Sequence, residues 1–226
     1  MHPLVLLPGM NCTADLWAGA GLDDAIAPQL GEPDMDRQVD ALLDRLPPRF
    51  VLAGLSLGAI VGMALAHRAP ERVLGLCVMS TNAKAPTAAQ RDGWQAWVDR
   101  LDAGESARAL QESILGSLLS DQGLSQPDLV ERTLAMGDGG ESALRAQLRL
   151  QQTRCDLRPA LAELPMPVLV IGGQQDVICP PTFHAEIAAA VPHSRFASIE
   201  GGHLLALERP VRIGALLRSW RGQNRI

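Results

Sequence analysis

The feature that most constrains the fold is an uncharged stretch in the first third of the chain, RFVLAGLSLGAIVGMALAH, at residues 49–67. Its central seventeen residues, 50–66, carry no formal charge. Glycines at 54, 58 and 62 give the small-residue spacing of membrane helices that pack closely. A spanning helix needs about 20 mostly apolar residues, however, and this shorter run carries the turn-like GLSLG at its centre. A buried strand followed by a buried helix gives the same apolar run, and the rest of the chain favours that interpretation.

Composition excludes several classes of protein. The chain has 226 residues, of which 47% are hydrophobic and 20% charged, as in an ordinary globular protein. The net charge of −5 and the absence of a basic cluster beyond a short tail, RSWRGQNRI, argue against a nucleic-acid partner. The start, MHPLVLLPGM, lacks the basic region of an export signal, so we expect a cytoplasmic protein without a membrane anchor. Four scattered cysteines form no CxxC pair and predict neither a zinc site nor disulfides.

Short apolar runs alternate with longer helical patterns, which is typical of a parallel sheet flanked by helices. Six runs are candidate strands: Leu4–Leu7, Ala25–Ala27, Phe50–Ala53, Leu74–Met79, Val168–Ile171 and Arg195–Ile199. Pro28 beside the second run predicts an edge position, because proline cannot donate a ladder hydrogen bond.

Residues 82–164 contain no strand pattern and instead predict helices at about 87–103, 105–119, 127–136 and 141–155. The breaks between them, AGES, SDQGLSQP and GDGGES, carry helix stop and start signals. A helical block inserted between two strands suggests a cap over the sheet edge where substrates bind. We therefore expect a core formed by residues 1–81 and 165–226, with a helical cap at 82–164.

The GLSLG sequence fits G-x-S-x-G, the nucleophile elbow, in which a serine sits on a sharp turn between a strand and a helix. Side chains at Gly54 or Gly58 would collide across that turn, and Ser56 would be held in a strained conformation that exposes its hydroxyl. The motif alone is a weak signal. Its context fits, because FVLA before it is strand-like and GAIVGMALAHRAP after it is helical.

Serine needs a base, and the base needs an orienting acid. Asp176 follows a buried strand in VLVIGGQQDVICP, and His203 follows another in FASIEGGHLLALERP. The order Ser, Asp, His is the one expected for a serine on this elbow. The other histidines, at 2, 67, 184 and 193, follow no strand at a glycine-rich turn, so we interpret them as surface or helix-end residues. Glu200 and Glu208 flank His203, and we interpret them as a strand-end charge and a solvated helix residue.

With these motifs in place, nearly the whole chain resembles the α/β-hydrolase superfamily. LPGM resembles its oxyanion loop, GLSLG its elbow, GGQQDVICP its acid turn and GGHLLALERP its histidine loop. The resemblance implies Ser56 as nucleophile, Asp176 as acid and His203 as base, with oxyanion donors from the backbone amides of Met10 and Leu57. It also implies a mostly parallel sheet with an inserted cap, and neither a metal nor an organic cofactor. The sequence departs from the family pattern at its start, because it begins directly at the oxyanion strand without the usual antiparallel hairpin, and we therefore expect a reduced sheet of about six strands.

The resemblance predicts a serine hydrolase that cleaves carboxylic esters, or thioesters or lactones, of small to medium, largely apolar substrates through an acyl-enzyme. Two alternatives stay open: carbon–carbon bond hydrolysis with the same triad, and a ligand-binding or signalling protein on the same fold. Trp94 and Trp97 would line an acyl pocket or pack the cap onto itself. The sequence leaves the natural substrate and the oligomeric state open.

Overall fold

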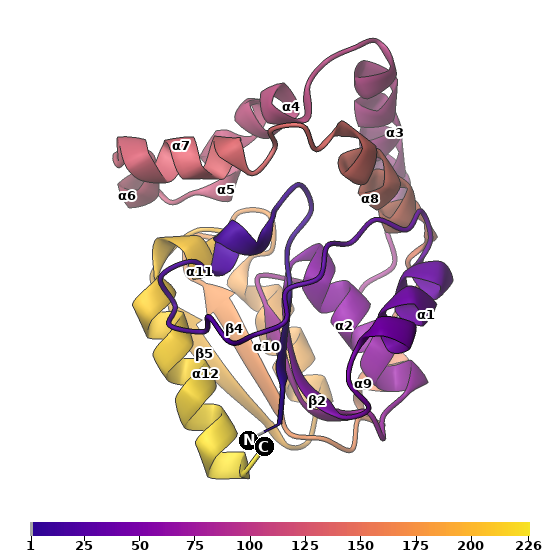
Figure 1. Ribbon diagram of the computed structural model, residues 1–226, viewed down its shortest axis with the longest axis vertical. Helices are drawn as coiled ribbons and strands as arrows, with labels where there is room; N and C mark the ends of the chain where they lie inside the picture. The colour runs from indigo at the N-terminus through magenta and orange to yellow at the C-terminus, as the bar shows by residue number, and fades with distance from the viewer. Residues whose placement is uncertain (1) are drawn as a thin grey trace.

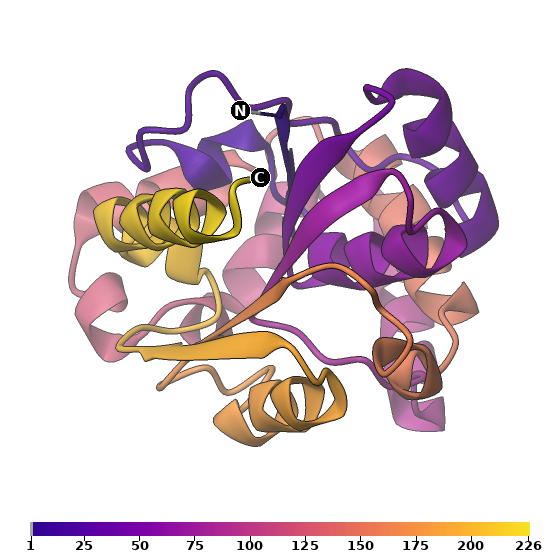
Figure 2. The same ribbon diagram turned by 90° about the horizontal axis from the view of Figure 1, so that it is seen from below.

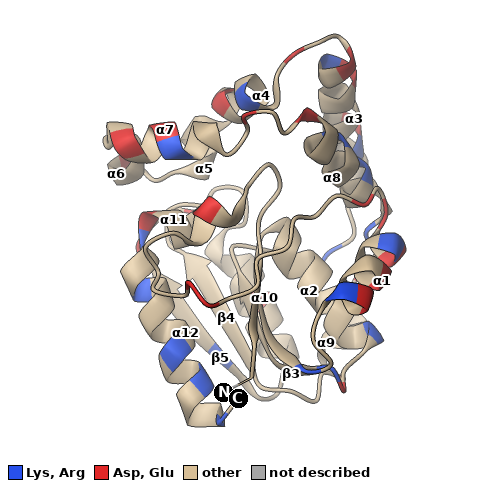
Figure 3. Cartoon of the chain, viewed as in Figure 1, with Lys and Arg blue, Asp and Glu red and all other residues tan. Residues whose placement is uncertain are grey.

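The computed structural model describes residues 2–226, and within them the sheet is parallel with five strands in the order β1-β2-β3-β4-β5. The strands are β1 (Leu4–Leu7), β2 (Phe50–Leu55), β3 (Val73–Met79), β4 (Val168–Gly173) and β5 (Ser194–Ile199). Five of the six predicted strands are thus confirmed. The first four carry no charged residue, as expected of parallel strands covered on both faces (Figure 3).

The sixth predicted strand, Ala25–Ala27, is reduced to a single parallel bridge between Val5 and Ile26. Ile26 donates to the Leu4 carbonyl and accepts from the Leu6 amide, both at 2.8 Å. The next ladder bond would need an N–H at Pro28, which proline lacks, so pairing stops there. The segment does lie at the sheet edge, beside β1, as Pro28 predicted.

The direction of winding reverses beside β1. After β1 the chain crosses through the 3-10 helix η1 (Ala14–Trp17) to the bridge on one side, and it returns through α1 (Met35–Arg45) to β2 on the other. Such reversal points, at the carboxyl ends of the strands, are where α/β sheets bind ligands.

Helices cover both faces of the sheet (Figures 1 and 2). One face packs against α1 with α2 (Leu57–Arg68), α9 (Arg158–Leu161) and α10 (Pro181–Ala190). The other packs against η1 with α11 (Leu205–Glu208) and α12 (Pro210–Asn224). Alternate residues of each buried strand enter the two cores, as Val5 and Leu6 of β1 do.

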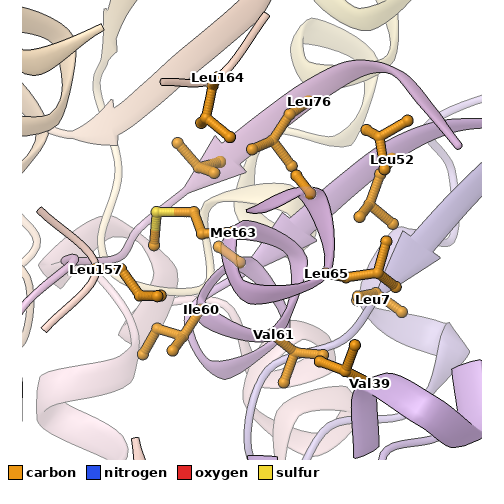
Figure 4. Close-up of a cluster of buried hydrophobic side chains, with 14 of the residues drawn as sticks. Leu7, Val39, Leu52, Ile60, Val61, Met63, Leu65, Leu76, Leu157 and Leu164 are labelled. Carbon is orange, nitrogen blue, oxygen red and sulfur yellow. The ribbon is translucent and has the colours of Figure 1, made fainter. Parts of the chain in front are cut away.

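The uncharged run at residues 49–67 folds as β2 and α2. Helix α2 is enclosed between the sheet and α1, so it is apolar on nearly every side (Figure 4). Val61 meets Val39 of α1, and Leu65 lies beside Leu7 of β1 (Figure 4). Among residues 2–226, no helix combines the length and apolar character needed to cross a membrane.

The segment between β3 and β4 is helical, as predicted, and lies across the carboxyl end of the sheet, at the top of Figure 1. Its main helices are α3 (Ala88–Asp102), α4 (Ala107–Ser113), α5 (Leu115–Leu118), α6 (Asp121–Leu124), α7 (Pro127–Ala135) and α8 (Glu141–Thr153). Helices α3, α4 and α8 share a small core of their own around Leu101 and Leu148. Residues of α5 and α7 instead join the core beneath α11, so only part of the segment packs on itself.

Candidate active site

Ser56 lies between β2 and α2 with φ of 54° and ψ of −116°, a conformation that side chains rarely adopt. The glycines around it are required by close approach. A Cβ on Gly54 would lie 2.4 Å from the carbonyl oxygen of Gly58, and a Cβ on Gly58 would lie 2.3 Å from that of Leu7. The turn therefore requires glycine at both positions, because even the Cβ of alanine would overlap the backbone.

Ser56, His203 and Asp176 meet at the carboxyl ends of β2, β5 and β4. The His203 Nε2 lies 2.9 Å from the Ser56 Oγ, and its Nδ1 lies 3.0 Å from both carboxylate oxygens of Asp176. His203 and Asp176 are buried, whereas Ser56 is partly exposed. This arrangement gives one ring nitrogen an acid partner and leaves the other facing the hydroxyl.

The Asp176 carboxylate is held by its own turn. Its Oδ1 accepts hydrogen bonds from the backbone amides of Ile178, at 3.0 Å, and Cys179, at 2.8 Å. With His203 added, three hydrogen-bond donors surround this buried group. A carboxylate oxygen that accepts the Nδ1 hydrogen selects the tautomer in which Nε2 can accept a proton from serine.

The two residues whose amides are expected to form an oxyanion hole belong to different elements. Leu57 is the first residue of α2, where an N–H has no intrahelical partner. Met10 follows β1 and lines the same cavity as Ser56. Within residues 2–226, neither amide donates a hydrogen bond to another group of the chain, so both are free to bind a ligand oxygen.

A cavity of about 160 Å³ opens above Ser56 and His203, and both predicted pocket residues, Trp94 and Trp97 of α3, line it. Apolar side chains of α2, α5 and the Asp176 turn contribute to its wall. The wall is more polar than the sequence led us to expect, because the helical segment also contributes Gln90, Gln111, Gln151 and Arg154.

Two buried residues near the site were misjudged from the sequence. Glu208, interpreted as a solvated helix residue, is buried and accepts hydrogen bonds from the amide of Gly202 at 2.8 Å and from both the amide and the hydroxyl of Ser120. His184, expected at the surface or a helix end, is fully buried in α10, and its Nε2 accepts from the Thr81 amide at 3.0 Å. Burial lowers the pKa of His184. No local sequence signal marks the contacts with Ser120 and Thr81, because both partners are distant in the chain.

Two thiols, Cys12 and Cys179, also line the cavity. Burial raises the pKa of each to about 12, so both stay neutral near pH 7. Nowhere in residues 2–226 do three His, Cys, Asp or Glu side chains gather closely enough to hold a metal ion.

Comparisons with known proteins identify the family of the chain. A family model described as alpha/beta hydrolase fold matches residues 17–210. The chain is 28% identical over 206 residues to the pimeloyl-(acyl-carrier protein) methyl ester esterase of Klebsiella pneumoniae, covering 78% of this chain and 76% of that protein. It is 29% identical over 187 residues to 3-oxoadipate enol-lactonase 2 of Acinetobacter baylyi, covering 76% and 64%. A thermophilic esterase from Thermogutta terrifontis superposes with a TM-score of 0.90 at 24% identity, covering 99% of this chain and 90% of that one.

The esterase and lactonase names of these relatives support an ester hydrolase at the level of the family. The family match spans most of the chain, and it includes the elbow and the turns that carry Asp176 and His203. The chain therefore belongs to the α/β-hydrolase fold family.

Proposed function

We propose that the protein is a serine esterase in which Ser56 is the nucleophile, His203 the general base and acid, and Asp176 the orienting acid. The observation that carries the proposal is the continuous series of contacts from the Ser56 Oγ through His203 to Asp176, opening onto a cavity. Serine is unreactive without a base, and this series supplies one.

In the first half-reaction, the His203 Nε2 takes the proton of Ser56 as the oxygen attacks the ester carbonyl carbon. The negative charge that forms on the carbonyl oxygen is stabilised by the amides of Met10 and Leu57, and one such donor is typically worth about 3 kcal/mol. The carbon–oxygen bond to the alcohol then breaks, and the alcohol leaves with the proton from His203. The acyl group stays on Ser56.

In the second half-reaction, His203 removes a proton from water as the water oxygen attacks the acyl-enzyme. The same two amides stabilise the second tetrahedral intermediate. Collapse releases the carboxylic acid and returns the proton to Ser56. The buried Asp176 carboxylate stabilises the imidazolium form of His203 in both halves.

The helical segment at residues 82–164 acts in this proposal as the cap that closes the cavity. Trp94 and Trp97 would contact the acyl chain, and the cavity volume of about 160 Å³ suits small to medium esters. Thioesters and lactones fit the same chemistry, because each presents an acyl carbon to Ser56. A cytoplasmic location stays a prediction that cell fractionation would test.

The test is hydrolysis of p-nitrophenyl esters over a range of acyl lengths, with rapid mixing to detect an acyl-enzyme burst. Ser56→Ala should lower kcat by up to about a million-fold, by analogy with other triads. Ser80→Ala is the matched control. Ser80 also follows a strand with a positive φ, but it is buried and its hydroxyl has no hydrogen-bond partner in the part of the chain that the structure describes.

Multiple turnovers that disappear in Ser56→Ala alone would support the esterase. A single turnover per protein molecule would instead favour a ligand-binding role on the same fold. Turnover of carbon–carbon bonds in diketone-like substrates, without ester hydrolysis, would favour the alternative hydrolase.

A further inference from the structure

Arg154 is the one strong charge in the wall of the cavity that contains Ser56, among the residues that the structure describes. It follows α8 directly, and only 6% of its surface is exposed. An arginine side chain remains protonated at any pH a protein meets. A full positive charge is therefore held inside the proposed substrate cavity.

The contacts of this charge are all neutral. Its Nη1 donates to the Gln151 Oε1 at 3.0 Å, and its Nη2 reaches the Gln90 Oε1 at 3.4 Å. The Gln90 oxygen also accepts from the Thr87 amide at 3.0 Å, so it is shared. The guanidinium lies 5.1 Å from the centre of the Trp94 ring. Its Nε has no partner within residues 2–226.

Several other arginines of the same helical segment are paired with acids. Arg100 meets Glu105, Arg108 meets Glu131 and Asp138, and Arg145 meets Asp102, all within 3.3 Å. These pairs are at least partly exposed to solvent, where water solvates the charges and an ion pair contributes little to stability. Arg154 is the more buried group, yet no carboxylate of the described chain pairs with it.

A buried cation is strongly disfavoured unless a paired anion compensates for its lost hydration. Burial indeed lowers the pKa of Arg154. The Trp94 ring and two glutamine oxygens compensate in part. A carboxylate in the cavity would complete the compensation, because the planar guanidinium can donate two parallel hydrogen bonds to such a group.

We propose that Arg154, with the side-chain amides of Gln90 and Gln151, forms a subsite for a substrate carboxylate, so that the physiological ester carries a second, ionised carboxyl group. The inference rests on the proposed ester hydrolysis and narrows its substrate class from largely apolar esters to esters with one anionic end. A purely structural Arg154, which only joins α8 to Trp94 of α3, would not distinguish an anionic substrate from a neutral one.

The test compares esters that differ only in charge. Half-methyl esters of dicarboxylic acids, from succinate to suberate, are measured beside the same molecules with the free carboxylate replaced by a primary amide. We expect kcat/KM to be roughly ten- to a hundredfold higher for the carboxylate at the best chain length, as for other charge-assisted hydrogen bonds. Most of the difference should be in KM. A parallel series with the carboxylate on the alcohol half shows which side of the ester faces Arg154.

Arg154→Met keeps an unbranched side chain beside Trp94 and removes the charge, so the carboxylate-to-amide ratio of kcat/KM should fall to about one. Arg154→Lys should restore part of the ratio. Arg91→Met is the matched control, because Arg91 is an exposed cation near Arg154 that does not line the cavity, so its loss should leave the ratio high. A ratio near one in the wild type, in both series, would overturn the proposal. So would an equal fall for both substrates in Arg154→Met.

A binding measurement separates this inference from the esterase proposal, because it needs only a folded cavity with Arg154 in place and no turnover. Ser56→Ala is titrated calorimetrically with free adipate and glutarate, and with their diamides. Tighter binding of the diacids by tenfold or more supports the carboxylate subsite even if no ester is turned over. Equal or undetectable binding of both would contradict it, even if ester hydrolysis is established.

Discussion

The cavity has a sheet wall, which carries Ser56 and His203 at the carboxyl ends of the strands, and a helical wall, which is formed by residues 82–164. The two walls differ in how completely their polar groups are paired. On the sheet wall, the Asp176 carboxylate accepts two backbone amides and His203, and His203 in turn meets Ser56. On the helical wall, Arg154 has only glutamine oxygens and an aromatic ring. A reacting group has to be oriented before the substrate arrives, whereas a recognition group can be completed by the substrate itself. The difference therefore assigns the reaction to the sheet wall and the recognition of the substrate to the helical wall.

The sheet wall should be the more sensitive to loss of a single hydrogen-bond acceptor. Asp176→Asn keeps the shape but favours the wrong tautomer of His203, and we expect kcat to fall about ten thousandfold. The thermal midpoint of Asp176→Asn should stay close to that of the wild type, which would show that the loss of kcat does not come from unfolding. Asp138→Asn, in an exposed acid of the helical segment, is the control and should retain full activity. A tenfold or smaller effect of Asp176→Asn would remove the basis for treating this wall as the reacting one.

The two glycines of α2 differ in how much space their surroundings leave for a side chain. Gly58→Ala would bring a Cβ to 2.3 Å from the Leu7 carbonyl oxygen and 2.6 Å from that of Pro8. We expect a loss of about 3 kcal/mol of unfolding free energy, together with loss of turnover. Gly62→Ala, one turn further along α2, meets only ordinary contacts at 3.4 Å and beyond. It should be neutral or slightly stabilising in urea unfolding. Equal destabilisation by both variants would contradict the account of the elbow.

Glu208 connects the two walls, because it binds the Gly202 amide next to His203 and Ser120 at the start of α6. Glu208→Ala leaves these buried donors without an acceptor, which should cost about 2 to 4 kcal/mol of unfolding free energy. Denaturant unfolding measures it, with Glu200→Ala as the control at an exposed neighbour. If the two variants were equally stable, the walls would not be joined through Glu208.

His184, in α10, should make the unfolding free energy depend on pH in the acidic range. Burial lowers its pKa in the folded protein, so below the unfolded value of about 6.5 the unfolded chain binds the extra proton. The contribution of His184 to stability is therefore fully present above about pH 6.5 and is lost as the pH falls below it, by at most about 1.4 kcal/mol per pH unit. In His184→Gln the dependence of the unfolding free energy on pH over this range should be shallower. An identical slope in both proteins would show that His184 does not titrate on unfolding.

The smallest effect expected is from the thiols. Cys12 and Cys179 line the cavity with a pKa raised to about 12, and burial also raises the pKa of Cys77. Only Cys155 of the four cysteines is exposed. Iodoacetamide at pH 8 should therefore add one group, at Cys155, and leave activity unchanged, as intact-mass and peptide analysis would report. A second adduct in the native protein, with loss of activity, would mean that the cavity wall opens.

Much of the sheet wall was predictable from sequence because its signals are local. Ser56, Asp176 and His203 each follow a strand pattern at a turn, and the carboxyl ends of parallel strands converge on one edge. The strand at residues 25–27 was overpredicted because three apolar residues resemble a strand, while Pro28 stops the pairing. The same proline correctly placed the segment at the sheet edge.

Sequence by itself thus determined the α/β-hydrolase fold, the winding of strands and helices, and the three residues that meet at the sheet edge, because periodicity and turn chemistry act between near neighbours. Only the tertiary structure decided that Glu208 and His184 are buried and that Arg154 faces the cavity without an acid. Each depends on partners far along the chain or on how helices that are distant in the sequence pack together. Burial sets the electrostatics of such groups, and burial is a property of the folded molecule.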